Sequence, residues 1–178
     1  MKDNVSVKRS GIVALGGMIA AVSVVLMLLT VYIPLLEQAL PALAGVLLIA
    51  AVIETGAGWA FVIYIAVGLL SLLFAFNNGA AFYYILFFGL YTIVKSFIER
   101  IPIKPLQWVV KLLFFNMCAV AVYFVIFVWI LHLPDSVFKY GYAATLAVIN
   151  VVFIVYDIAL SRLVVTYRTR IRKLFRKL

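Results

Sequence analysis

Apolar segments of about 20 residues follow one another along most of the chain, each long enough to cross a hydrocarbon layer of about 30 Å as a helix. Of the 178 residues, 68% are hydrophobic and 12% are charged, and the mean hydropathy is +1.24. So few polar residues cannot cover a water-soluble globule of this size. The alternating pattern of membrane-barrel strands is missing. The sequence therefore predicts an all-α polytopic membrane protein, because helices close their backbone hydrogen bonds internally.

Helix-breaking residues divide this apolar sequence into six spans. The tract 40–76 is far longer than one span needs, so we expect it to fold back at 54–58, where Glu54 and two glycines interrupt it. Pro34 ends the first span, and the Asn-Asn-Gly sequence before residue 80 is typical of a turn. Prolines 102 and 105 disfavour continued helix. We thus predict six transmembrane helices in one bundle within residues 1–166, namely 11–33, 39–53, the stretch from the 54–58 turn to 76, 80–96, 107–131 and 142–165.

The basic residues predict the orientation of these spans. Six of the fifteen Lys and Arg lie between Arg168 and Lys177, and cations beside a spanning helix are retained on the cytoplasmic face. Six spans place both termini on that side, together with Arg100 and Lys104, and leave Lys139 alone outside. The expected location is the cell membrane, with multiple passes and with the N- and C-termini cytoplasmic.

The last residues, 167–178, form a separate basic tail. Its apolar side chains recur at helical spacing and would lie on one stripe, opposite the cations. A helix of this kind lies in the headgroup layer, where each cation gains about 1 kcal/mol from anionic lipid. We therefore expect anionic lipids as partners of the tail through a stripe made of Ile171, Leu174, Phe175 and Leu178.

Several classes of function are disfavoured. The net charge of +9 sits at helix ends rather than on a soluble face, which argues against nucleic acid. Cys118 and His132 are the only cysteine and histidine, so Cys- or His-cluster metal sites are not expected. Paired carboxylates, a Ser-His-acid arrangement and a phosphate-binding glycine loop are all missing. The sequence predicts no enzyme, no cofactor and no metal, and any energy from ATP would have to come from a partner.

Polar and aromatic residues gather at the expected outer ends of the spans. A mostly apolar pocket with a few directing polar groups is typical of a small-molecule site, although an interfacial aromatic belt with ordinary turns would give the same composition. The wider set is Glu37, Gln38, Asn77, Asn78, Tyr83, Tyr84, His132, Asp135, Tyr140 and Tyr142. The predicted substrate-binding residues are Glu37, Asn77, Asn78, Tyr84 and Asp135, with Asn116 from within a span.

Three polar residues, Asn116, Asn150 and Asp157, fall within or near the apolar spans and are expected to face inward. For Asp157 we expect an ion pair with Arg162 or Lys111 rather than a proton path, which generally needs several ionisable groups in series. For Asn116 an interhelical hydrogen bond is the favoured interpretation, and a ligand contact is the alternative.

The first span carries small residues at a spacing of four, with Gly16 paired to Ala20 and Gly17 to Ala21. Such stripes allow close approach of another helix, either within the chain or in a partner. Ala143 and Ala147 form a second, weaker stripe in the last span.

Taken together, the short six-helix chain, the basic flank and this stripe resemble the substrate-binding S component of bacterial energy-coupling-factor (ECF) transporters. The resemblance implies that helix one docks a transmembrane coupling subunit through Gly16, Gly17, Ala20 and Ala21. It also implies that the outer loops capture a vitamin-like solute, delivered through a partner ATPase pair. The alternative is a non-transporting scaffold or cell-envelope assembly subunit, similar to the small rod-shape membrane proteins. A membrane-embedded enzyme is the least favoured class.

Overall fold

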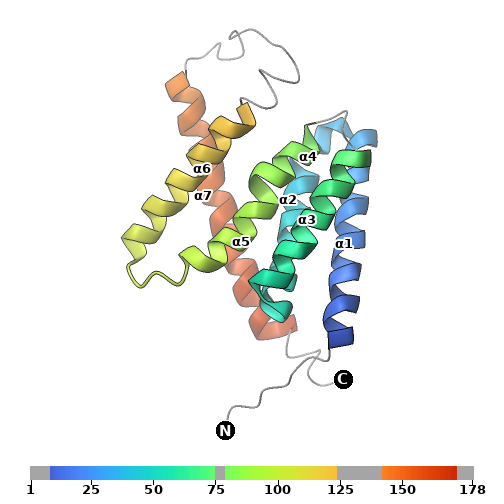
Figure 1. The fold of residues 1–178 in the computed structure, drawn as a ribbon. Helices are drawn as coiled ribbons and strands as arrows, with labels where there is room; N and C mark the ends of the chain where they lie inside the picture. The colour runs from blue at the N-terminus through green and yellow to red at the C-terminus, as the bar shows by residue number, and fades with distance from the viewer. Residues whose placement is uncertain (1–8, 75–78, 124–141, 172–178) are drawn as a thin grey trace. The chain divides into compact units, whose positions relative to one another are not determined.

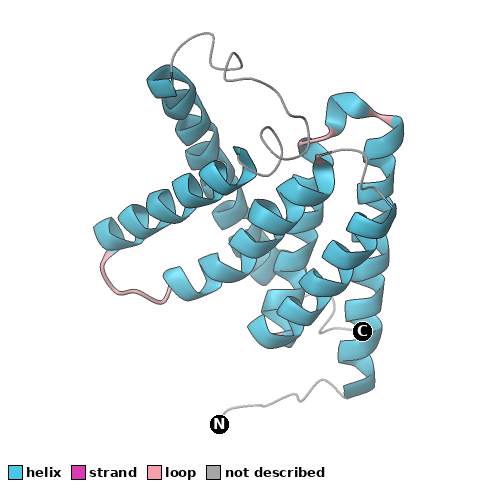
Figure 2. Ribbon diagram, turned by 45° about the horizontal axis from the view of Figure 1, so that its top comes forward, coloured by secondary structure: helices cyan, strands magenta, loops and turns pink. Residues whose placement is uncertain are grey.

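The computed structural model describes residues 9–74, 79–123 and 142–171, and over these ranges the chain is helical and contains no strand (Figure 2). Five helical segments are long and apolar enough to cross a membrane, and a sixth apolar helix, α2, is shorter, with 17 residues. The predicted all-α membrane fold is thus confirmed. The elements are α1 (Arg9–Tyr32), η1 (Pro34–Leu36), α2 (Ala39–Thr55), α3 (Ala57–Phe74), α4 (Ala80–Tyr83), η2 (Tyr84–Phe88), α5 (Gly89–Ile98), α6 (Lys104–Val122), α7 (Tyr142–Thr166) and η5 (Tyr167–Ile171) (Figure 1).

The helix boundaries follow the predicted breaks closely. Between α2 and α3 the chain turns at Gly56, whose φ of 90° lies in the left-handed region that glycine adopts without strain. One boundary differs, because α6 begins at Lys104 rather than near Gln107. Pro105 occupies the first turn of this helix, where its missing N–H costs no hydrogen bond. The final part of the predicted fifth span lies outside the described residues.

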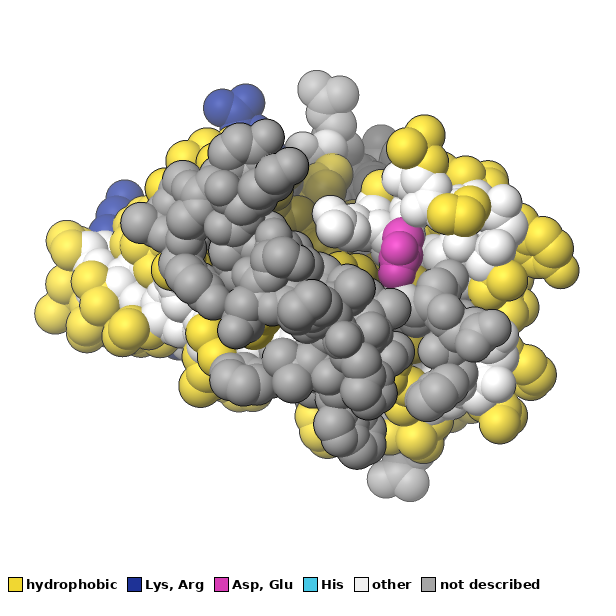
Figure 3. All heavy atoms as spheres, turned by 90° about the horizontal axis from the view of Figure 1, so that it is seen from above, with side chains coloured by type: hydrophobic (Ala, Val, Ile, Leu, Met, Phe, Trp, Pro, Cys, Tyr) yellow, Lys and Arg dark blue, Asp and Glu magenta, His cyan; other side chains and the backbone are white. Residues whose placement is uncertain are grey.

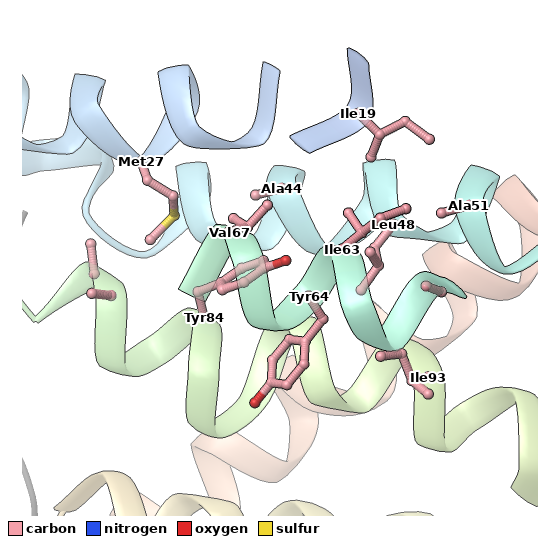
Figure 4. Close-up of a cluster of buried hydrophobic side chains, with 13 residues drawn as sticks. Ile19, Met27, Ala44, Leu48, Ala51, Ile63, Tyr64, Val67, Tyr84 and Ile93 are labelled. Carbon is pink, nitrogen blue, oxygen red and sulfur yellow. The ribbon is translucent and has the colours of Figure 1, made fainter. Parts of the chain in front are cut away.

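The chain forms two compact units, Met1–Ser96 and Phe97–Leu178. In the first unit, α1 packs against α2 and α3, and α4 and η2 also pack against α2 and α3 (Figure 1). The start of α5 meets α2 through Thr92 and α3 through Gly89. Small side chains at the contacts bring the helix backbones close together, as is usual between membrane helices. The core contains small and large buried side chains from all four spans, among them Met27, Ala44, Leu48, Ala51, Ile63, Val67 and Tyr84 (Figure 4).

The fourth span is a continuous helix with a π-helical turn, η2, inserted between α4 and α5. A wider turn disturbs the regular backbone ladder, and neighbouring helices provide additional hydrogen bonds here. The Tyr64 hydroxyl of α3 donates to the Ile85 carbonyl at 2.8 Å. The Thr92 hydroxyl lies 2.9 Å from the Gly45 carbonyl of α2 and 3.1 Å from the Phe88 carbonyl of its own helix. Both contacts hold this turn against α2 and α3.

In the second unit, α6 and α7 meet through stacked rings and polar pairs. Phe115 and Phe153 stack with centroids 4.4 Å apart and an interplanar angle of 9°. This aromatic contact lies between two polar contacts, one involving Asn116 and the other Lys111. The two helices are therefore joined at three successive levels.

Many large apolar side chains face outward on the spanning helices. Leu73 of α3 is 73% exposed and Leu113 of α6 is 67% exposed. A space-filling view shows hydrophobic side chains over much of the described surface (Figure 3). Exposed apolar area on this scale fits a lipid solvent, in which outward Leu and Val cost nothing.

Candidate functional site

A small polar cluster lies where α1 is joined to α2 and the fourth span begins. The chain leaves α1 through the single turn of η1, which starts at Pro34, and this brings Glu37 and Gln38 beside Tyr83 of α4. The Tyr83 hydroxyl is hydrogen-bonded to the Gln38 side chain and lies within electrostatic range of the Glu37 carboxylate. Glu37 and Tyr83 are half-buried and Gln38 is exposed. The cluster therefore offers a carboxylate, an amide and a phenol to a molecule arriving at this end of the unit.

Tyr84, the predicted binding residue of the fourth span, lies in the core of the first unit. Its ring packs at 5.9 Å from that of Tyr64, and its side chain is fully buried (Figure 4). Its hydroxyl has no hydrogen-bond partner within the described part of the chain. Tyr83, one residue earlier, is the aromatic residue that reaches Glu37 and Gln38. The sequence pattern alone gives no way of choosing between adjacent tyrosines, because they differ only by about 100° around the helix.

Asn116 forms the interhelical hydrogen bond expected for it, with Asn150 of α7. The two amides donate to each other's oxygen at 3.0 and 3.1 Å. Each nitrogen also donates to the carbonyl four residues earlier, at 2.8 Å for Leu112 and 2.7 Å for Leu146. Both N–H bonds of each amide are thus used, which explains how two such polar groups are accommodated in the spans. The remaining predicted binding residues, Asn77, Asn78 and Asp135, lie outside the described residues.

Asp157 forms the predicted ion pair, and its partner is Lys111. The ammonium lies 2.8 Å from the Asp157 carboxylate, with side chains only 6% and 2% exposed. Glu99 adds a second carboxylate at 3.7 Å from the same nitrogen. The Lys111 ammonium also lies 5.3 Å from the centroid of the Trp108 ring. A buried lysine is thereby flanked by two acids and an aromatic face.

These groups line an open cleft of about 830 Å³ within the second unit, which the sequence-based site prediction did not include. On α6, the polar residues Lys104, Gln107 and Lys111 recur together with Trp108 at the spacing of one helix face. This polar face on an apolar span was the sequence feature that could have indicated the cleft. The lining consists of Glu99, Lys104, Gln107, Trp108, Lys111, Asp157, Ile158, Ser161, Arg162, Val165 and Thr166.

The two small-residue pairs of α1 separate onto different faces. Gly16 is buried, and a Cβ at that position would lie 3.1 Å from the Ile63 side chain of α3. Ala20, four residues later, packs against the same core. Gly17 and Ala21 are exposed, and a Cβ on Gly17 would meet nothing within 4 Å. Internal packing therefore accounts for the first pair, and the second pair leaves a flat outward surface.

Among the described residues no group of three His, Cys, Asp or Glu side chains could hold a metal ion, and Cys118 is a buried free thiol. No family model, curated protein or solved structure matches this chain.

Proposed function

We propose that the chain is the membrane-embedded solute-binding subunit of an ECF-type uptake transporter, and that it captures a vitamin-like molecule from outside. The observation that carries the proposal is the division of α1 into two faces. One face packs on α2 and α3, and the other presents Gly17 and Ala21 outward. A span with a bare small-residue face can approach a helix of another protein closely. A transmembrane coupling subunit, itself bound to an ATPase pair, is the partner that this class of protein requires.

The solute site of this proposal is the polar cluster formed by Glu37, Gln38 and Tyr83, extended by the predicted Asn77, Asn78 and Asp135. A half-buried carboxylate beside an amide and a phenol favours a solute that carries an amine or several hydrogen-bond donors. The proposal is for capture and release without catalysis, with ATP hydrolysis supplied by the partner.

Docking is tested by co-purification with the coupling subunit and the ATPase pair after co-expression. The double variant Gly17→Leu and Ala21→Leu should reduce recovery of the partners at least ten-fold, because two bulky side chains would fill the flat face. Met18→Leu is the matched control, since Met18 is exposed on α1 and the change conserves volume. Normal recovery with the double variant, at unchanged thermal stability, would refute this docking surface.

Solute capture is tested by thermal unfolding of the purified chain against a panel of vitamins and their precursors. A ligand that binds only the native state at a hundred times its Kd stabilises that state by about 2.7 kcal/mol. Glu37→Gln should abolish the shift, whereas Glu54→Gln, at the other end of α2, should retain it. A well-folded sample that responds to no member of the panel would count against the proposal.

The alternative, a non-transporting scaffold in envelope assembly, is favoured by one observation. The Asn116 and Asn150 amides donate to each other across the two helices and to carbonyls of their own helices, which is the role expected if polar groups only join the spans. Co-purification with envelope-synthesis proteins, without an ATPase pair, would support this alternative.

A further inference from the structure

The cleft between α6 and α7 lies at the ends of two spanning helices. It begins at Lys104, the first residue of α6, and extends along α7 to Thr166. The loop that connects α5 to α6 borders it, fixed by the Gln107 amide, which donates to the Ile101 carbonyl at 2.6 Å. Residues at helix ends beside a connecting loop lie at headgroup depth rather than in the hydrocarbon.

The charges of the cleft are of two kinds. Lys111, Asp157 and Glu99 form a connected ion-pair group, whose buried part is the bond between Lys111 and Asp157. Lys104 and Arg162 are exposed and make no ion pair or hydrogen bond with any residue that the structure describes. With three cations and two carboxylates, the lining carries one positive charge in excess.

The surroundings of the two unpaired cations are apolar and aromatic. Ile158 and Val165 of α7 line the cleft and are exposed, and Trp108 contributes an amphipathic ring from α6. Other exposed apolar residues lie on both helices, among them Leu113 of α6 and Val155 of α7. A ligand that combines one anionic group with apolar chains matches this arrangement.

We infer that the cleft binds the phosphate of an anionic phospholipid, with Arg162 and Lys104 contacting the phosphate and the acyl chains running along α6 and α7. A phosphodiester carries the single negative charge that neutralises the cleft. The Arg162 guanidinium can donate two parallel hydrogen bonds to phosphate oxygens, and the Lys104 ammonium adds a point charge. This site is separate from the basic tail and does not depend on the proposed transport function.

The test uses the full chain in a neutral detergent, with thermal unfolding followed as lipid is added. Phosphatidylglycerol is compared with phosphatidylcholine of the same acyl chains, and with glycerol 3-phosphate, which has no chains. The wild type should be stabilised by phosphatidylglycerol at a lower lipid fraction than by phosphatidylcholine. In the double variant Arg162→Gln and Lys104→Gln, apparent affinity for phosphatidylglycerol should fall about thirty-fold, or about five-fold for each cation.

Arg168→Gln is the matched control, because Arg168 is an exposed cation just beyond Thr166 that does not line the cleft. It should keep nearly all of the preference for phosphatidylglycerol. An equal loss in this control would mean diffuse attraction to the tail and would overturn the site. Full stabilisation by glycerol 3-phosphate alone would overturn the lipid assignment in favour of a soluble phosphate. If the double variant unfolds without lipid, Arg162→Gln is measured alone. Its apparent affinity for phosphatidylglycerol should fall about five-fold, and an unchanged affinity would overturn the site.

Discussion

Lys111 and Asp157 form a buried ion pair between α6 and α7. Their contact at 2.8 Å, with both side chains almost fully covered, offsets the cost of removing two ions from water. Glu99 and the Trp108 ring also lie beside the ammonium. The pair thus fixes which faces of α6 and α7 meet.

Removing one member of this pair should therefore cost more than removing both. Lys111→Met removes the ammonium that the buried Asp157 carboxylate contacts, and we expect it to lower the free energy of unfolding by about 3–5 kcal/mol. Asp157→Leu should cost less, because the Glu99 carboxylate still lies 3.7 Å from the Lys111 ammonium. The double variant replaces the pair with apolar side chains and should recover most of that loss. Thermal unfolding in detergent, followed by circular dichroism, measures the order of the three midpoints.

Arg168→Met is the control for this series, because it removes an exposed cation just beyond the end of α7 that does not line the cleft. Its unfolding midpoint should match that of the wild type. A double variant no more stable than either single variant would show that the pair is not the reason for the destabilisation.

Among the elements, the π-helical turn η2 lies close to α2 and α3 because Gly45 and Gly89 leave room at the contacts. A Cβ on Gly45 would lie 2.7 Å from the Phe88 carbonyl oxygen, and one on Gly89 would lie 2.7 Å from the Tyr64 ring. Both contacts involve groups that cannot move aside easily. The fourth span can therefore lie this close to α2 and α3 only with hydrogen at those positions.

Gly45→Ala should consequently destabilise the protein, by about 1–3 kcal/mol if the core behaves as other overpacked interiors do. The new methyl group would separate α2 from η2 and weaken the Thr92 contact to the Gly45 carbonyl. Gly58→Ala is the control, since a Cβ there meets nothing within 4 Å, and it should be neutral or slightly stabilising. The measurement is the thermal unfolding midpoint of both variants. Equal midpoints for Gly45→Ala and Gly58→Ala would contradict this account.

On the scale of the whole molecule, the remaining question of topology concerns α2, which has 17 residues. At 1.5 Å per residue it is about 26 Å long, slightly less than the hydrocarbon thickness. A short span of this kind is accommodated by local thinning of the bilayer. If α2 crosses the membrane, three spans separate Gln38 from Ile103, and these residues lie on opposite sides.

Single-cysteine labelling tests this arrangement. Cys118 is the only cysteine, so Cys118→Ser gives a background without thiols. In that background a membrane-impermeant maleimide should label Gln38→Cys in intact cells and Ile103→Cys only after lysis, since both positions are exposed in connecting segments. A thiol added after Leu178 should behave as at Ile103. Labelling of Gln38→Cys and Ile103→Cys from the same side would contradict six spans and remove the outer solute site.

The sequence predicted the local features well. The bilayer thickness sets the length of each apolar run. Local backbone preferences, which act within a few residues, set the turn at Gly56 and the break before α6. The start of α6 was placed three residues late, because a proline in the first turn of a helix resembles one that ends it. The need of Asp157 and Asn116 for partners also followed from the sequence alone, since polar groups in hydrocarbon must be paired.

Only the tertiary structure decided which partners these were. Lys111 rather than Arg162 pairs with Asp157, Tyr83 rather than Tyr84 reaches Glu37, and Gly16 rather than Gly17 packs inside. Each choice depends on how far a helix is rotated about its axis, and a helix that is apolar on all sides carries no sequence signal for that angle. The rotation is set by close contacts between helices, and with it the faces left for a solute, a partner subunit or a lipid.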